Sequence, residues 1–163
     1  MHDRHARPLL AALATAATLA TPAAFAAKPP PDPCSLLPAA EVSHALGRPF
    51  GPPASSVAPR PYRNTAQGTD CLYQASHGSL LFRVYFDESA AQSADLFKRL
   101  EMFFGSGTPV PGVGDDTYID RQHALHERKG NVRFYLRLDG VHETGSAKEK
   151  VLVDLAKGIG GRL

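Results

Sequence analysis

The chain has 163 residues, with 18 basic and 16 acidic side chains and a formal net charge of +2. Because the two signs nearly balance, we expect neither a nucleic-acid partner nor general binding to a membrane surface. A chain of this length is long enough for one domain with one hydrophobic core.

The first 26 residues have the pattern of a secretion signal. Arg4 and Arg7 precede an uncharged apolar run, and Ala24-Phe25-Ala26 is a small-x-small cleavage site. The run is short and contains proline and threonine, so it suits a cleaved signal better than the alternative, an uncleaved membrane anchor. We expect residues 1–26 to be removed on export, leaving a periplasmic or secreted protein without a membrane span.

The chain has two cysteines, Cys34 and Cys71. An even number of cysteines in an exported protein predicts a disulfide bond. A redox or metal-binding pair is the alternative, but the chain lacks the Cys-x-x-Cys spacing that would favour it. Cys34 follows a proline-rich stretch and not a small apolar run, so it does not have the context of a lipidated cysteine.

The positions of proline and glycine and the helical spacing of apolar residues predict the elements before the first hairpin. A Pro-rich tether covers residues 27–33. The first helix is predicted over 38–46 and ends at Gly47. Residues 48–69 are rich in proline, and we expect a short edge strand near 55–58 within them.

The next elements are two strands with alternating apolar residues, joined by a predicted two-residue turn at His77-Gly78. That turn pairs Tyr73 with Phe82 and Cys71 with Val84 and places all four on the buried face. The disulfide therefore enters the core side of the sheet. A slip of one residue would expose the phenylalanines, so the faces are well specified.

A second helix is predicted over 89–104, where apolar residues form one stripe. A strand reaches about Asp120, and two further strands over 123–128 and 131–139 are joined by a tight turn. A capping box that begins at Ser146 predicts the start of the last helix.

Two registers are open for the last pair of strands. A two-residue turn buries Leu125, and it places His123 and Glu127 on the core side as well. A three-residue turn buries Ala124 and His126 instead. We prefer the first register because it buries leucine.

These elements predict an α+β fold for residues 34–163, a single disulfide-linked domain. The expected order is α-(β)-β-β-α-β-β-β-α. Strand pairs with helices on one face would form a two-layer sandwich on an antiparallel sheet.

Three short motifs resemble a known family. They are Pro33-Cys34-Ser35-Leu36-Leu37, Cys71-Leu72-Tyr73, and the turn Gly112-Val113-Gly114-Asp115. The chain is similar to a family of secreted bacterial proteins of unknown function, many of which are actinobacterial lipoproteins. The resemblance implies an α+β fold and a disulfide between Cys34 and Cys71. It implies no activity, because none is established for the family, and this chain lacks the lipidation site common there.

No pattern typical of an enzyme is present. The Gly112-x-Gly114-Asp115 turn precedes a predicted strand, whereas a phosphate-binding loop needs a following helix. His123 and His126 are three residues apart on a strand, which sends the imidazoles to opposite faces and disfavours a zinc site. The chain also has no Gly-x-Ser-x-Gly motif. We therefore predict no catalytic residue, no metal site and no cofactor.

Arginine and tyrosine gather on the outer face of the predicted sheet. Strand alternation directs these side chains away from the core, so we expect them to be exposed. Both residue types are enriched at binding hot spots, and arginine can clamp a carboxylate or a phosphate. The candidate binding face consists of Arg83, Tyr85, Arg133, Tyr135 and Arg137, with His126 and Arg128 as further candidates.

Three functions stay open. A binding module would use the candidate face for an anionic ligand or an envelope protein, and an open, concave face would favour it. A structural or accessory envelope protein would have a solvated sheet face, or one covered by residues 48–69. An enzyme would need a deep cleft with converging His, Asp and Ser side chains.

Overall fold

The computed structural model describes the chain from residue 31 to its end, except for residues 62, 64, 106 and 141–144. The predicted signal, residues 1–26, and residues 27–30 of the tether lie outside the described residues. Within the described ranges, no helix is both long enough and apolar enough to cross a membrane.

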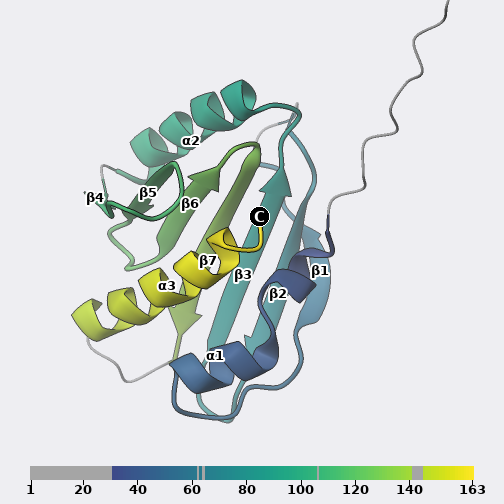
Figure 1. The fold of residues 1–163 in the computed structure, drawn as a ribbon, viewed down its shortest axis with the longest axis vertical. Coiled ribbons are helices and arrows are strands. Elements are labelled where there is room, and N and C mark those ends of the chain that lie inside the picture. The colour runs from purple at the N-terminus through teal and green to yellow at the C-terminus, as the bar shows by residue number, and fades with distance from the viewer. Residues whose placement is uncertain (1–30, 62, 64, 106, 141–144) are drawn as a thin grey trace, which may run out of the picture.

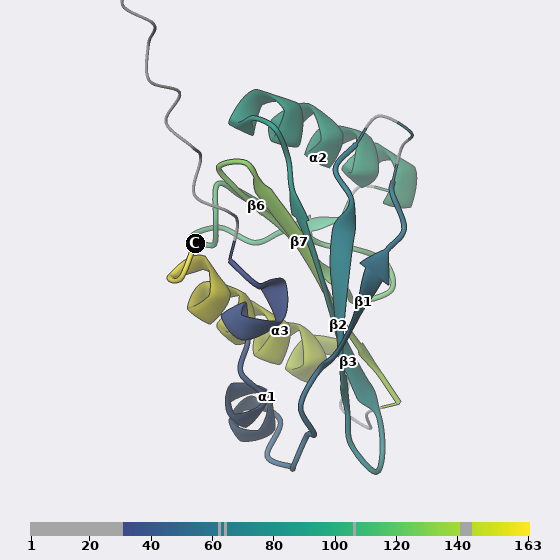
Figure 2. The same cartoon turned by 90° about the vertical axis from the view of Figure 1, so that its right-hand side faces the viewer.

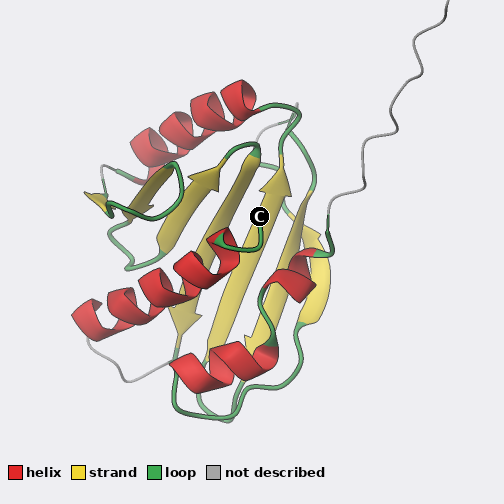
Figure 3. Cartoon of the chain, viewed as in Figure 1, coloured by secondary structure: helices red, strands yellow, loops and turns green. Residues whose placement is uncertain are grey.

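The α+β class and the predicted order of elements are confirmed, with a short 3-10 helix, η1, and a short strand, β4, in addition. The described helices are η1 (Pro33–Leu36), α1 (Ala39–Ala45), α2 (Ala90–Phe104) and α3 (Gly145–Gly160) (Figure 1). The described strands are β1 (Ala54–Ala58), β2 (Gly68–Gln74), β3 (Ser79–Phe86), β4 (Thr108–Pro109), β5 (Asp116–Ile119), β6 (Leu125–Lys129) and β7 (Val132–Asp139) (Figure 3).

The strands form one antiparallel sheet in the order β1-β2-β3-β7-β6-β5-β4. The central pair, β3 and β7, joins the two hairpins of the chain. On the core side of this pair, the rings of Phe82 and Phe134 meet edge to face, with 5.7 Å between their centroids. Leu136 and Leu138 on β7 are fully buried on the same side.

α1 and α3 lie on the core side of the sheet (Figure 2). Leu152, Leu155 and Ile159 of α3 belong to the same buried cluster as Val42 of α1 and Phe82 of the sheet. These contacts bury the apolar stripes of both helices, as their periodicity predicts.

The prediction that all helices share one face is wrong for α2. Phe97 of α2 packs against Tyr118, and Phe104 packs against His126, at 5.2 and 5.3 Å between ring centroids. Tyr118 and His126 pair across β5 and β6 on the face opposite the core. Figure 2 shows α2 crossing the end of the sheet away from α1. An apolar stripe predicts that a helix is buried, but both faces of this sheet offer aromatic side chains to bury it.

Both predicted hairpin registers are off by two residues. Tyr73 lies opposite Leu80, and residues 75–78 form a four-residue turn that ends at Gly78, whose φ is +99°. Leu125 lies opposite Leu136, and the two-residue turn is Gly130-Asn131 instead of Lys129-Gly130. Because side chains alternate with a period of two, a shift of two residues leaves every side chain on its predicted face.

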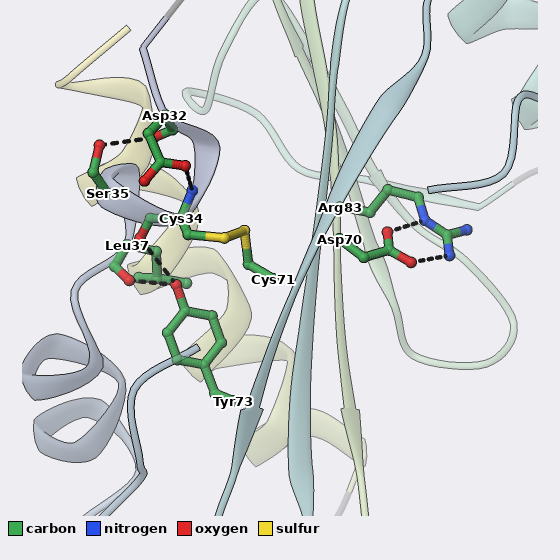
Figure 4. Close-up of a disulfide and its surroundings, with 8 residues drawn as sticks. All are labelled: Asp32, Cys34, Ser35, Leu37, Asp70, Cys71, Tyr73 and Arg83. Carbon is green, nitrogen blue, oxygen red and sulfur yellow. Dashed lines mark hydrogen bonds and ion pairs between the residues drawn. A yellow bond between two sulfur atoms is a disulfide. The ribbon is translucent and has the colours of Figure 1, made fainter. Parts of the chain in front are cut away.

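The disulfide between Cys34 and Cys71 is confirmed, with 5.4 Å between the two Cα atoms. It ties η1 to β2 on the core side of the sheet, as Figure 4 shows. Tyr73 lies two residues further along β2, and its hydroxyl donates a hydrogen bond to the carbonyl of Leu37. The N-terminal segment is therefore fixed to the sheet by one covalent bond and one buried hydrogen bond.

Candidate functional site

The five residues of the predicted binding face lie on β3 and β7, on the side of the sheet opposite the disulfide. Tyr85 is opposite Arg133 and Arg83 is opposite Tyr135, so arginine and tyrosine alternate both along and across the strands. Figure 4 shows Arg83 and the disulfide on opposite sides of the strands. We call Arg83, Tyr85, Arg133, Tyr135 and Arg137 the Arg/Tyr face.

All five residues line one groove of about 430 Å³. The Arg/Tyr face, together with Leu81 of β3, forms its floor. One wall comes from the second half of α2, and a second wall comes from Pro59, Arg60 and Pro61 of the Pro-rich segment. The lining residues of α2 are Phe97, Leu100, Phe103 and Phe104, and His126 of β6 also lines the groove.

The Pro-rich segment flanks the groove through a bond to its floor. The hydroxyl of Tyr85 donates a hydrogen bond of 2.8 Å to the carbonyl of Pro59. Arg60 is exposed, and its Nε donates to the neutral side-chain oxygen of Gln67 at 3.1 Å. Of the described residues in 48–69, Pro59, Arg60 and Pro61 line the groove, so they form a wall and do not cover the whole face.

Tyr85 is only 7% exposed, so the prediction that it is exposed is wrong. The same prediction is wrong for Arg133. Its side chain forms a bidentate ion pair with Asp87, at 2.6 and 2.9 Å, and is only 3% exposed. The guanidinium carbon also lies 4.9 Å from the centre of the Tyr85 ring. Nη1 of Arg133 is buried and has no hydrogen-bond partner among the described residues. The guanidinium of Arg133 is therefore engaged by Asp87 and Tyr85 within the floor of the groove, and its role there is structural.

The two remaining arginines of the face are also paired, but they are more accessible. Arg83 forms a bidentate pair with Asp70 at 2.6 and 2.8 Å (Figure 4). Arg137 is 42% exposed and bonds Asp139 at 2.8 Å and the hydroxyl of Tyr135 at 3.4 Å. Arg137 is therefore the cation of the floor that a ligand can reach most directly.

His126 is fixed in the groove by a carboxylate and by aromatic rings. Its Nε2 lies 2.9 Å from Oδ2 of Asp120, and the imidazole stacks on Tyr118 with 4.6 Å between centroids. Oδ1 of Asp120 accepts hydrogen bonds from the backbone amides of Gln122 and Ala124. Burial alone would raise the pKa of Asp120, but these hydrogen bonds, that from His126 first, lower it below its usual value.

Asp120 and the wall formed by α2 were not predicted from the sequence. One signal for the wall was present, because the apolar stripe of α2 continues to its last turn. There Met102 and Phe103 are 74% and 79% exposed, although large apolar side chains usually seek a partner. No comparable signal linked Asp120 to His126.

The histidine and aspartate residues considered above as metal or phosphate sites form hydrogen bonds with nearby side chains or backbone amides. His123 lies 2.6 Å from Glu149 of α3, away from His126. Oδ2 of Asp115 accepts a hydrogen bond of 2.7 Å from the amide of Gly130, so it fastens the 112–115 turn to the last hairpin. In the part of the chain that the structure describes, no group of three or more His, Cys, Asp or Glu side chains could hold a metal ion.

No protein-family model matches the chain, and no curated protein matches it at a significant level. The resemblance to a family of secreted bacterial proteins therefore stays a prediction from the three motifs.

Proposed function

We propose that the protein is an exported binding module whose groove takes a small organic anion with an apolar body. The observation that carries the proposal is the composition of the groove. Aromatic and aliphatic side chains of α2 stand beside a floor that contains Arg83 and Arg137. Its volume of about 430 Å³ falls in the range of roughly 300–1,000 Å³ typical of small-molecule sites.

The residues suggest how each part of such a ligand would be held. The apolar body would contact Leu100 and Phe103 on the wall and the ring of Tyr135 on the floor. The anionic group would accept hydrogen bonds from Arg137, which keeps accessible donors, and would lie near Arg60. No step of bond making or breaking is part of this proposal.

Export is part of the same proposal and is supported by two features. Residues 1–26 have the pattern of a cleaved signal, and the Cys34–Cys71 disulfide suits an oxidising compartment such as the periplasm or the extracellular medium. Protein outside the cytoplasm should begin near Ala27, which N-terminal sequencing can establish.

The groove can be tested with 8-anilinonaphthalene-1-sulfonate (ANS), an aromatic monoanion that fluoresces when it binds an apolar site. We expect saturable binding to the folded protein. Arg137→Gln should weaken it by about tenfold or more, the equivalent of a lost hydrogen bond to a charged group. Leu100→Glu should weaken it by a similar factor, because it places a negative charge in the apolar wall beside the anion. Arg99→Gln is the matched control, because Arg99 is 58% exposed on α2, pairs with Asp95 and does not line the groove.

Equal affinity of all three variants and the wild type would disprove binding in the groove. A second candidate, docking of an envelope protein, is favoured by two exposed apolar residues, Phe103, which lines the groove, and its chain neighbour Met102. If this second candidate is right, the wild type should not bind ANS. It should instead capture a periplasmic protein, and Phe103→Ser should abolish that capture.

A further inference from the structure

The charges around the groove are almost completely paired. Each basic side chain of the lining has its own carboxylate partner, except Arg60, which bonds the neutral Gln67. The pairs among the described residues are Arg83–Asp70, Arg133–Asp87, Arg137–Asp139 and His126–Asp120.

This pairing sets the charge that a ligand meets. When His126 is neutral, the four lining arginines and the four aspartates cancel. An anion entering this apolar groove would then leave one negative charge without compensation, which is costly away from water. When His126 is protonated, the groove carries one positive charge and matches a monoanion.

We infer that the groove binds an organic acid of single negative charge together with one proton, which His126 takes up from solvent. The inference rests on the proposed function and adds the charge class of the ligand. The only bond formed is N–H on the imidazole. Because Nε2 is engaged by Asp120 at 2.9 Å, the imidazolium would keep that bond and gain an N–H donor at Nδ1. No described residue hydrogen-bonds Nδ1.

The phenols, the arginines and Asp120 around His126 do not change charge over the same pH range. On β5 and β7, burial raises the pKa of Tyr118 and Tyr135, so both phenols stay neutral. Arg83, Arg133 and Arg137 stay charged at every physiological pH, and Asp120 stays ionised because its pKa is lowered.

Two more carboxyl groups lie near this region. Glu101, on α2, is near Tyr118 and is partly exposed. Glu127 follows His126 on β6 and points to the core side of the sheet, where burial raises its pKa to about 8. Because this carboxyl also ionises between pH 5.5 and 8.5, ANS binding is compared in Glu127→Gln as well, which should keep the wild-type pH dependence. An imidazole is the side chain whose charge ordinarily changes between pH 5 and 8. His126 is thus placed to couple proton uptake to anion binding.

The direct test measures ANS affinity at pH 5.5 and pH 8.5, a range over which the sulfonate stays ionised. We expect binding to weaken by about tenfold at the higher pH, about 1.4 kcal/mol. Titration calorimetry between pH 5.5 and 8.5, in two buffers of different ionisation enthalpy, should show proton uptake that reaches about half a proton per ANS, the maximum that linkage allows for a tenfold change. This measurement uses the wild type, so it does not depend on the folding of any variant.

Variants assign the proton to His126. Asp120→Asn removes one negative charge and should bind ANS at pH 8.5 about as tightly as the wild type does at pH 5.5. His126→Gln should bind weakly at both pH values. His123→Gln is the matched control, because His123 is 51% exposed and lies outside the groove, and it should keep the wild-type pH dependence.

The charge class is tested by competition. Naphthalene-1-sulfonate should displace ANS at least tenfold more effectively than naphthalene-1,5-disulfonate, which has the same ring system and one more charge. Binding of ANS that is independent of pH, without proton uptake, would overturn the inference and leave the binding function standing. Absence of ANS binding at every pH would instead disprove the proposed function.

Discussion

Arg133 and Asp87 form a bidentate ion pair, at 2.6 and 2.9 Å, in which both side chains are almost completely buried. Asp87 directly follows β3 and precedes α2, while Arg133 lies near the start of β7. The amide of Asp87 also donates a hydrogen bond of 2.8 Å to the carbonyl of Asn131. The pair therefore fixes the point where the chain leaves the sheet for α2.

Arg133→Ala should destabilise the fold strongly, because it leaves the Asp87 carboxylate buried without its partner. Breaking a buried ion pair from one side costs about 3–5 kcal/mol. Arg137→Ala should change the free energy of unfolding by no more than about 0.5 kcal/mol, since Arg137 is partly exposed. Urea unfolding of the two variants measures the difference. Equal stability of the two would show that the Asp87 pair contributes little.

The faces of the strands could be predicted from the sequence, but the pairing partners could not. Alternation on β7 correctly separates Phe134 and Leu136 from Arg133 and Tyr135. The same alternation is unchanged when a strand slides by two residues, so the predicted pairing partners lie two residues away from the observed ones. The burial of Arg133 depends on Asp87, which is 46 residues away, and no local pattern connects them.

The floor of the candidate site could be predicted from the sequence, but its walls could not. The Arg/Tyr face followed from local alternation, whereas the groove needs α2 on the outer side of the sheet. The apolar stripe of α2 predicts that Phe97 and Phe104 are buried, but they pack against Tyr118 and His126, which belong to later strands. Contacts between segments that are distant in the sequence depend on tertiary packing. Such contacts place the walls of the groove and bring Asp120 next to His126.

The disulfide should contribute substantially to stability. The two cysteines are 37 positions apart, and the chain-entropy model gives about 4 kcal/mol for a loop of this length. Reduction, or the double variant Cys34→Ala with Cys71→Ala, should lower the free energy of unfolding by up to that amount. Urea unfolding with and without reductant measures the effect. Unchanged stability after complete reduction would contradict it.

The two glycines of the 112–115 turn should differ in importance. Both have positive φ, +78° at Gly112 and +57° at Gly114, so alanine at either costs about 1–2 kcal/mol of backbone strain. A Cβ at Gly114 would also lie 2.7 Å from the carbonyl oxygen of Arg128, whereas one at Gly112 would meet nothing within 4 Å. Gly114→Ala should therefore melt at a clearly lower temperature than Gly112→Ala. Identical melting temperatures would mean that the turn moves to relieve the contact.

Glu127 should make the protein less stable as the pH rises. Its side chain is fully buried, and neither carboxyl oxygen has a hydrogen-bond partner among the described residues. Burial raises the pKa of Glu127 from 4.5 to about 8, a shift that nearby Lys129 opposes. The folded protein therefore keeps this carboxyl protonated at neutral pH, whereas the unfolded chain ionises it.

The sign of the effect follows from that difference. Below about pH 4.5 both states are protonated, and Glu127 has no effect on the pH dependence of stability. Between pH 4.5 and about 8 the unfolded state loses its proton while the folded state keeps it, so stability falls, and above about 8 the loss levels off. The total loss is on the order of 5 kcal/mol.

Glu127→Gln replaces the protonated acid with a neutral side chain of the same shape. Its stability should match that of the wild type near pH 4 and exceed it increasingly toward pH 8. Urea unfolding at intervals across this range measures both curves, and Glu88→Gln, on an exposed residue, serves as the control. Parallel curves for Glu127→Gln and the wild type would show that the carboxyl of Glu127 is ionised and compensated in the folded protein.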